Sequence, residues 1–294
     1  AQRDDRAQPR IQRLAEGFGH PDPPVLSAAE LVALAREQGW TDEWRSRTGA
    51  VSSASAPDVV LNALSFDEAE TRARLTAHPE LARSLLAGQG AVTLRDSRNQ
   101  MRGLDGICQT ALELHCAYGC LHACDYCHVG SVLNIATNLE ALAEHVREVV
   151  AANRWCQLWK LDNGTDTITL EPEYGASEVM VNLFAELPDA YLMLYTKSDN
   201  VDHLLGLDHR GHTLISWSLA AATASRLIEK KSPPMRDRIA AMQRCQEAGY
   251  RVRVRLSPIC PVVNWREETT QMLEALCGAV QPEVITMDVL GWMN

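Results

Sequence analysis

The sequence predicts an α/β fold: a partial (β/α)6 TIM-like barrel preceded by a small helical subdomain. From about residue 108, six strand-like runs alternate with helical stretches, and the loops between them are short. Such βαβ repetition is typical of a parallel sheet covered by helices, either doubly wound or curled into a barrel. Six strands favour an open, partial barrel, whose chemistry lies at the carboxyl ends of the strands.

Two regions are expected from this pattern: a mostly helical subdomain over residues 1–107 and the barrel over residues 108–294. Residues 1–24 are polar and rich in charge and proline, which predicts a loosely ordered lead-in. The chain begins at Ala1 without a methionine and stops directly after the sixth strand-like run. We therefore expect it to be part of a longer product, with an incomplete C-terminal end.

Two capping boxes mark helices in the first region. Ser27-Ala-Ala-Glu30 opens an amphipathic stretch that runs to about Gln38, and Ser65-Phe-Asp-Glu68 opens helical segments to about Ala87. His78-Pro79 breaks the second stretch. No residue pattern in this region indicates chemistry, so we expect it to pack against the barrel.

The barrel elements follow one another in regular order. The strands are predicted at 111–116, 156–162, 190–196, 213–219, 250–257 and 283–289. The helices between them are predicted at 138–151, 175–187, 200–207, 235–247 and 266–280.

Composition limits the class of protein. With 294 residues and 46% hydrophobic content the chain can bury a full core. It has neither an apolar run of membrane-spanning length nor a signal segment, which predicts that it has no membrane partner. Its nine cysteines fit a reducing compartment, so a cytoplasmic location is expected. The net charge of −10 argues against a nucleic-acid partner and favours a neutral or cationic small molecule.

One short segment, Cys116 to Gly130, holds four of the nine cysteines and follows the first barrel strand. Read from Cys120, the spacing is Cys-x3-Cys-x2-Cys, and Tyr126 stands just before the last cysteine. Three thiolates, from Cys120, Cys124 and Cys127, would leave one iron of a [4Fe–4S] cluster free to bind a small molecule. Two alternatives stay open: a zinc site completed by His122 or His128, and a triplet that begins at Cys116.

The cysteine spacing and Tyr126 resemble the signature of radical S-adenosylmethionine (SAM) enzymes. Several further blocks resemble the spore photoproduct lyase branch of that superfamily, which repairs a thymine dimer in spore DNA. These blocks are Thr196 to Leu205, Ser216 to Leu219, Glu247 to Ile259, and Trp265. The resemblance implies a [4Fe–4S] cluster, SAM, a reducing electron donor such as a flavodoxin-like protein or dithionite, and a 5′-deoxyadenosyl radical that removes a hydrogen atom from substrate.

The resemblance also implies roles for individual residues. Lys197 would pair with the SAM carboxylate, and Ser218 would hydrogen-bond SAM. The loop from Asp162 to Asp166 lies where the family holds the SAM amino group or relays the radical. The cofactor-binding residues expected on this basis are Tyr126, Asn163, Thr165, Lys197, Ser218 and Arg253, the last from the alternating run Arg251-Val-Arg-Val-Arg255.

Two departures from the lyases shape the expected substrate. His128 stands where they carry a second tyrosine, and Asn163 stands where they carry a hydrogen-donating cysteine. Cys156, the nearest cysteine, lies upstream at the start of the second strand. Because an amide is no thiol hydrogen-atom donor, the relay that closes DNA repair is expected to be absent.

These departures, the acidic charge and carboxylates at the barrel mouth together predict an amino-sugar substrate. They resemble the radical SAM dehydratases of aminoglycoside antibiotic biosynthesis, such as the lyase that acts on the 3′ position of paromamine. His203, Asp166 and Glu171 are the candidate general acids or bases for the proton transfers. The alternatives are a DNA photoproduct lyase and a non-catalytic iron–sulfur or zinc protein.

Overall fold

The structure is a computed structural model of the 294-residue chain. It describes residues 5–40, 57–79, 85, 92–95, 110–127 and 132–290, and the account below concerns these residues. Within these ranges no helix combines the length and the apolar character needed to cross a membrane.

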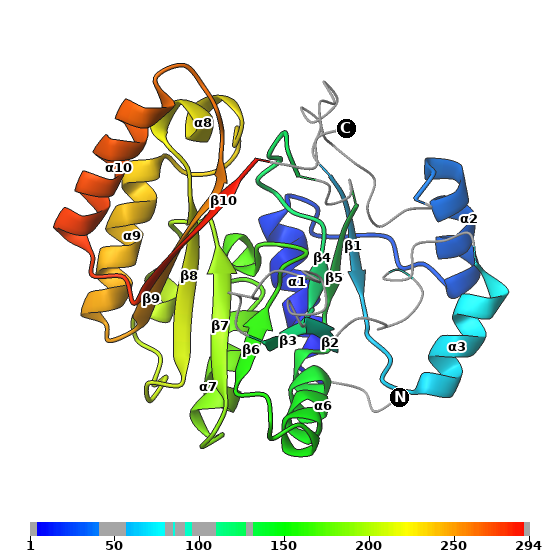
Figure 1. The fold of residues 1–294 in the computed structure, drawn as a ribbon. Helices are drawn as coiled ribbons and strands as arrows, with labels where there is room; N and C mark the ends of the chain where they lie inside the picture. Colours follow the sequence, from blue (N-terminus) through cyan, green and yellow to red (C-terminus); the bar gives the residue numbers. More distant parts are fainter. Residues whose placement is uncertain are drawn as a thin grey trace, which may run out of the picture.

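A seven-stranded sheet forms the centre of the molecule, in the order β10-β9-β8-β7-β6-β3-β2 (Figure 1). Six of its strands are parallel, and β2 (Val92–Arg95) pairs antiparallel with β3 at one edge. The parallel strands are β3 (Ala111–Leu114), β6 (Leu158–Leu161), β7 (Tyr191–Thr196), β8 (Thr213–Leu219), β9 (Arg251–Ile259) and β10 (Val284–Val289). The six strands lie within one or two residues of the predicted runs and form a curled half-barrel, which confirms the predicted partial barrel.

Helices return the chain between the strands on the outer side of this sheet. They are α6 (Leu139–Ala152), α7 (Ala176–Ala185), the short α8 (Ala222–Leu227), α9 (Met235–Glu247) and α10 (Trp265–Ala279). The predicted helix over 200–207 is only a three-residue 3-10 turn, η3 (Asp202–Leu204), and a second such turn, η2 (Thr167–Leu170), follows β6. In Figure 1, α9 and α10 lie side by side next to β9 and β10.

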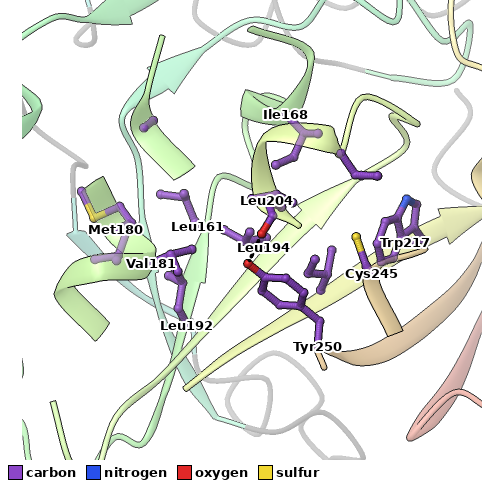
Figure 2. Close-up of a cluster of buried hydrophobic side chains, with 14 of the residues drawn as sticks. Leu161, Ile168, Met180, Val181, Leu192, Leu194, Leu204, Trp217, Cys245 and Tyr250 are labelled. Atoms are coloured by element: carbon purple, nitrogen blue, oxygen red, sulfur yellow. Dashed lines mark hydrogen bonds between the residues drawn. The ribbon is translucent and has the colours of Figure 1, made fainter. Parts of the chain in front are cut away.

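The main core fills the space between the sheet and these helices (Figure 2). Leu192 and Leu194 of β7 lie on the same side of the sheet, because every second strand residue points to the same side. They face the core that contains Met180 and Val181 of α7. Each such buried side chain stabilises the fold by roughly 1.5–3 kcal/mol. The Tyr250 hydroxyl at the start of β9 donates to the carbonyl of Leu204 at 2.8 Å, so it is buried without losing its hydrogen bond.

A second, three-stranded sheet, in the order β1-β5-β4, lies beside the half-barrel. It joins β1 (Asp58–Asn62) from the first region to β5 (Val132–Ala136) and β4 (Ala117–Tyr118), which flank the cysteine loop. Besides its helices, the first region therefore contributes β1 to the three-stranded sheet and β2 to the seven-stranded sheet. Its boundary near residue 107 lies outside the described residues and stays a prediction.

The helices of the first region agree only in part with the capping boxes. Helix α2 (Ala28–Gln38) begins as predicted, with the reciprocal bonds between Ser27 and Glu30 both formed. Helix α3 (Glu68–Ala77) instead begins after Asp67, whose carboxylate accepts from the Glu70 N–H at 2.9 Å. Asp67 is the better cap because it places its acceptor two residues closer to the helix. Most of the predicted continuation to Ala87 lies outside the described residues.

Helix α1 (Ala7–Gly17) corrects the expectation of a loosely ordered lead-in. Its Arg10 is only 4% exposed, and the guanidinium donates to the carbonyl of Tyr174 at 2.9 Å and to both oxygens of Glu140, at 2.8 and 3.0 Å. A bidentate bond between arginine and carboxylate is strong and directional. Arg10 therefore attaches α1 to the half-barrel.

We expect Arg10→Met to lower the free energy of unfolding by about 2–4 kcal/mol, because it removes charge-assisted bonds from a buried site. Chemical denaturation followed by circular dichroism measures this change. The matched control is Arg13→Met, since the Arg13 side chain is exposed and makes one bond, to the Glu173 carbonyl at 3.1 Å. Equal losses in the two variants would contradict the proposed attachment.

Candidate cluster and cofactor site

The cysteine loop leaves β3 at the carboxyl edge of the parallel sheet. Its backbone is closely held: Cys127 N–H donates to the Cys124 carbonyl at 3.0 Å, and Asp125 N–H donates to the Ile228 carbonyl at 3.0 Å. Cys124 is 5% exposed, whereas Cys120 and Cys127 are partly exposed. The loop thus presents its cysteines at the edge where barrel enzymes carry their chemistry.

The thiols of this loop lie within electrostatic reach of one another. Burial raises the pKa of Cys124 to about 11, although the positive charge of Lys197 opposes that rise. Burial also raises the pKa of Cys120, and the charges of Cys124 and Cys127 add to the effect. Without metal the Cys120 and Cys124 thiols hold their protons, so binding iron would release them. Among the described residues no three His, Cys, Asp or Glu side chains are grouped closely enough to hold a metal ion as they stand, so the three-thiolate cluster stays a prediction that rests on the spacing and proximity of these cysteines.

Cys116 points away from this group. Its side chain is 1% exposed and belongs to the main core, and its thiol donates to Asp162 Oδ2 at 2.8 Å while its N–H donates to Asp162 Oδ1 at 3.0 Å. These bonds join the ends of β3 and β6. The geometry favours Cys120, Cys124 and Cys127 over the triplet that begins at Cys116.

Asp162 gives the fold a pH dependence. Complete burial raises its pKa from 3.8 to about 7, against the opposing hydrogen bonds from Cys116. Because the folded chain holds this proton more tightly than the unfolded chain, stability falls as pH rises from about 4 to 7, by at most roughly 4 kcal/mol. We expect Asp162→Asn to flatten this slope in denaturation curves recorded across that range. Asp208→Asn, at an exposed carboxylate, is the control that should keep the slope, and an unchanged slope in Asp162→Asn would refute the assignment.

Lys197 lies beside the cysteine loop, at the carboxyl end of β7. Its ammonium is 5.8 Å from the centre of the Tyr126 ring and 3.6 Å from Glu229 Oε1. It is also close enough to Cys124 to oppose the rise in that thiol's pKa. The fold therefore brings together the predicted SAM-carboxylate partner, the aromatic residue of the signature and one predicted cluster ligand.

Strand register places Ser218 next to Lys197. Thr196 pairs with Trp217, and Ser218 pairs with Arg255. Arg255 therefore lies in the row of Ser218, whereas Arg253 pairs with Ser216, two positions further from the carboxyl edge, and bonds Glu283 at 2.7 Å. Arg253 was the arginine predicted to bind the cofactor, and that role stays a prediction; the pairing register adds Arg255 as the arginine level with Ser218.

Asp166 is a structural acceptor beside the cysteine loop. It accepts from His122 Nε2 at 2.8 Å, from Thr196 Oγ1 at 2.9 Å and from the Lys197 N–H at 2.7 Å. Burial alone would raise its pKa, but these bonds, chiefly from His122, hold it below its usual value. Both oxygens are occupied, so the contacts indicate that Asp166 positions His122 and Lys197. Its predicted role as a general acid or base stays a prediction.

The other predicted proton-transfer residues are not brought to the cysteine loop. Glu171 caps α7, since its oxygens accept from the N–H groups of Gly175 at 2.6 Å and Ser177 at 2.7 Å. This bonding gives Glu171 a structural role, and its predicted role as a general acid or base stays a prediction. His203 lies on η3, where neither ring nitrogen has a hydrogen bond within the described part of the chain. Burial lowers its pKa to about 4, against the opposing charge of Asp202, so it is neutral at pH 7.

Two predicted loop residues, Asn163 and Thr165, lie after β6 as expected. Asn163 is exposed, and its Nδ2 is 3.4 Å from Glu113 Oε1; Thr165 is partly exposed beside Asp166. A Cβ added to Gly164 between them would lie 3.4 Å from the Tyr118 ring, so a larger side chain there would contact the aromatic residue. His128 lies outside the described residues.

Comparison with known proteins identifies relatives of one kind. The family model described as spore photoproduct lyase matches residues 108–290. Spore photoproduct lyase of Clostridium acetobutylicum is 21% identical over 186 residues, which cover 60% of this chain and 55% of that protein. The Bacillus subtilis enzyme is 25% identical over 176 residues, which cover 57% of this chain and 51% of that protein. The chain thus spans about half the length of these curated relatives.

Solved structures support the fold. A double variant of spore photoproduct lyase with bound AdoMet and dinucleoside spore photoproduct has a TM-score of 0.56 at 18% identity, covering 77% of this chain and 75% of that one. A single variant of the same enzyme has a TM-score of 0.57 at 16% identity, covering 79% and 77%. At these identities the likeness establishes the half-barrel architecture.

The comparisons correct the predicted partner. An amino sugar was expected and nucleic acid was considered an unlikely partner, but the relatives are spore photoproduct lyases, and a variant of spore photoproduct lyase has been solved with dinucleoside spore photoproduct. The charge argument failed because a net charge of −10 sums the whole surface and does not report the sign inside the half-barrel, where β9 carries three arginines. The family model covers more than half of the chain. The chain belongs to the spore photoproduct lyase family, a radical SAM branch whose cofactors are a [4Fe–4S] cluster and SAM.

Proposed function

We propose that this protein is a radical SAM lyase that acts on a pyrimidine photoproduct in DNA or in a dinucleotide. One observation carries the proposal: Lys197 reaches Tyr126, Glu229 and the neighbourhood of Cys124 at the carboxyl edge of a half-barrel of the lyase family. A cationic lysine beside the cluster loop is the arrangement that would hold the carboxylate of SAM. The cytoplasmic location stays a prediction.

Each of the site residues has a separate proposed role. Cys120, Cys124 and Cys127 would hold the cluster, Lys197 would pair with the SAM carboxylate, and Ser218 would hydrogen-bond SAM. Bound together, the two cofactors supply the radical that removes a hydrogen atom from the substrate. Asp166 keeps the Lys197 backbone in place through its 2.7 Å bond to the amide.

The inner side of β9 supports a nucleotide substrate. Val252 and Val254 face the helices in the main core, so Arg251, Arg253 and Arg255 lie on the opposite side of the sheet. Arg251 stacks on the Tyr191 ring at 4.9 Å and Arg255 on the Tyr195 ring at 5.3 Å. Guanidinium groups bind phosphodiesters bidentately and aromatic rings stack on bases, so this face fits a dinucleotide better than a neutral sugar.

The carboxylates that pair with two of these arginines can be replaced by a substrate phosphate. Arg255 meets Asp288 at 3.2 Å and Arg251 meets Glu283 at 3.4 Å, and both carboxylates lie at the exposed edge of the sheet. Exposed ion pairs contribute little to stability, so a substrate phosphate would displace them at small cost.

The test uses anaerobically reconstituted protein, SAM, dithionite and dinucleoside spore photoproduct. The proposal predicts consumption of the photoproduct together with release of 5′-deoxyadenosine. Arg255→Gln should raise the KM about tenfold, the size expected from one charge-assisted bond, whereas Arg210→Gln, at an exposed arginine that pairs with Asp208, should not. Photoproduct recovered intact while SAM is cleaved would overturn the substrate assignment.

Asn163 provides a second test of the same proposal. Because the resemblance places a hydrogen-donating thiol at this position, we expect Asn163→Cys to increase the share of consumed photoproduct that is recovered as intact dinucleotide. Product analysis by liquid chromatography and mass spectrometry measures this share, and Asn163→Ser, which adds a hydroxyl instead of a thiol, is the control. An equal share in both variants would contradict a role for this position in hydrogen return.

A further inference from the structure

A segment between α8 and α9 contacts the cysteine loop at several points. We call residues 228–232 the clamp segment. The Ile228 carbonyl accepts from the Asp125 N–H at 3.0 Å, and the Lys231 N–H donates to the His122 carbonyl at 3.2 Å. The Ser232 hydroxyl lies 3.8 Å from Cys124 Sγ. The loop that carries the predicted cluster ligands is therefore held by a segment about a hundred residues later in the sequence.

Glu229 is the charged centre of the clamp segment. It is 0% exposed, and its Oε1 accepts a short hydrogen bond from the Tyr126 hydroxyl and lies 3.6 Å from Lys197 Nζ. One carboxylate oxygen therefore contacts the aromatic residue of the cysteine loop and the predicted SAM-binding lysine together. The distance between these two groups depends on where Glu229 is held.

Arg238 on α9 holds Glu229 in place. The guanidinium is also 0% exposed and lies 2.7 Å from Glu229 Oε2. Its other bonds go to the Pro233 carbonyl at 2.8 Å, to the Ser218 carbonyl at 3.1 Å and to Ser225 Oγ at 3.2 Å. Arg238 thus ties the clamp segment to the carboxyl end of β8, the strand that carries the predicted SAM contact Ser218.

A buried ion pair is weak evidence for stability, because removing two charges from water offsets most of their attraction. The Glu229–Arg238 pair lies where the cysteine loop, β7 and β8 meet, so a role other than stabilising the fold has to explain it. Through Glu229 and Arg238, helix α9 is joined to Tyr126, Lys197 and the Ser218 carbonyl, which belong to the residues predicted to bind SAM. Positioning is the role that these contacts fit.

We propose that the Glu229–Arg238 pair is a positioning device that fixes the cysteine loop and the Lys197 ammonium relative to each other, and so sets the affinity for SAM. The inference rests on the proposed radical SAM activity. Glu229 and Arg238 act through Tyr126, Lys197 and Ser218 and do not touch the reacting atoms.

The decisive experiment compares Glu229→Gln, Arg238→Met and the double variant. Arg238→Met leaves a buried carboxylate without its main partner and is the variant most prone to unfold. The double variant removes both charges, so it should recover the fold, as circular dichroism and thermal denaturation show. If the pair positions the loop, the double variant and Glu229→Gln should still bind SAM about tenfold more weakly than the unmodified protein, in equilibrium binding to cluster-loaded protein.

A second measurement needs no cofactor. Hydrogen exchange of residues 120–127 in protein without cluster should rise about tenfold in Glu229→Gln and in the double variant, because the hydrogen bond from the Tyr126 hydroxyl loses its charged acceptor and weakens. The matched control is Glu186→Gln with Arg147→Met, a pair at 2.6 Å whose side chains are 57% and 50% exposed and lie far from the cysteine loop in the fold. This control should change neither exchange nor SAM affinity.

The outcomes separate this inference from the proposed function. Unchanged exchange and unchanged SAM affinity in Glu229→Gln and the double variant would overturn the positioning role and leave the proposed function intact. A failure of the unmodified, cluster-loaded protein to bind SAM would overturn the proposed function first. Weaker SAM binding with faster exchange in both variants, and neither change in the control, supports the inference.

Discussion

Cys127→Ala is expected to abolish cluster binding, whereas Cys116→Ala is expected to retain it. With two thiolates left, the loop cannot hold a cluster that needs three protein ligands, so iron should fall from about four atoms per chain to background. Cys116 contributes instead to the core: its thiol and N–H both donate to Asp162. Its replacement should lower the free energy of unfolding by about 1–3 kcal/mol through the lost bond to a buried carboxyl group.

Iron and sulfide analysis after anaerobic reconstitution, together with the visible absorption spectrum, measures this difference. Cys277→Ala is the control for loss of a thiol as such, because Cys277 is exposed on α10. A Cys116→Ala protein without iron, beside a Cys127→Ala protein with a full cluster, would show that the ligand triplet begins at Cys116.

Lys197→Met is expected to weaken SAM binding by about 10- to 100-fold, the effect of losing one charge-assisted hydrogen bond of roughly 1.5–3 kcal/mol. Methionine keeps the length and the apolar stem of the side chain, so the packing on Tyr126 is largely preserved. Glu229 keeps its ion pair with Arg238 at 2.7 Å and is not left alone. The fold should therefore survive, and the loss should appear in SAM affinity.

Lys230→Met is the matched control for this prediction. Lys230 also lies next to the cysteine loop, but its ammonium pairs with Asp125 at 2.8 Å on the surface, where ion pairs contribute little. Equilibrium binding of SAM to the cluster-loaded variants gives the comparison. Equal affinities in the Lys197 and Lys230 variants would contradict the assignment of Lys197 to the SAM carboxylate.

The strands of the barrel were predictable because their signal is local. Apolar runs such as the one at Tyr191–Thr196 and the helical period of Met235–Glu247 can be read within one window of sequence. Strands β1 and β5 were missed because their pairing partners lie about 70 residues apart, and neither run stands out alone. Helix α1 was missed for a related reason: it is attached by Arg10 to residues 127 and 164 positions away.

The site was predictable where the residues themselves carry a signature. Cysteine spacing and Tyr126 pointed to the cluster loop, and the strand-end block pointed to Lys197. The backbone contacts of Asp166 and Glu171 could not be predicted, because the sequence does not distinguish a loop carboxylate that faces a substrate from one that accepts from backbone amides. Glu229 and Arg238 gave no sequence signal, since their meaning depends on the fold bringing α9 to the cysteine loop.

The most direct test of the central claim is the electron paramagnetic resonance spectrum of the reduced, anaerobically reconstituted protein, recorded with and without SAM. The account predicts about four irons per chain and a spectrum that changes on addition of SAM, because the iron without a protein ligand binds it. A protein that contains zinc, or a cluster whose spectrum is unaffected by saturating SAM, would contradict the account.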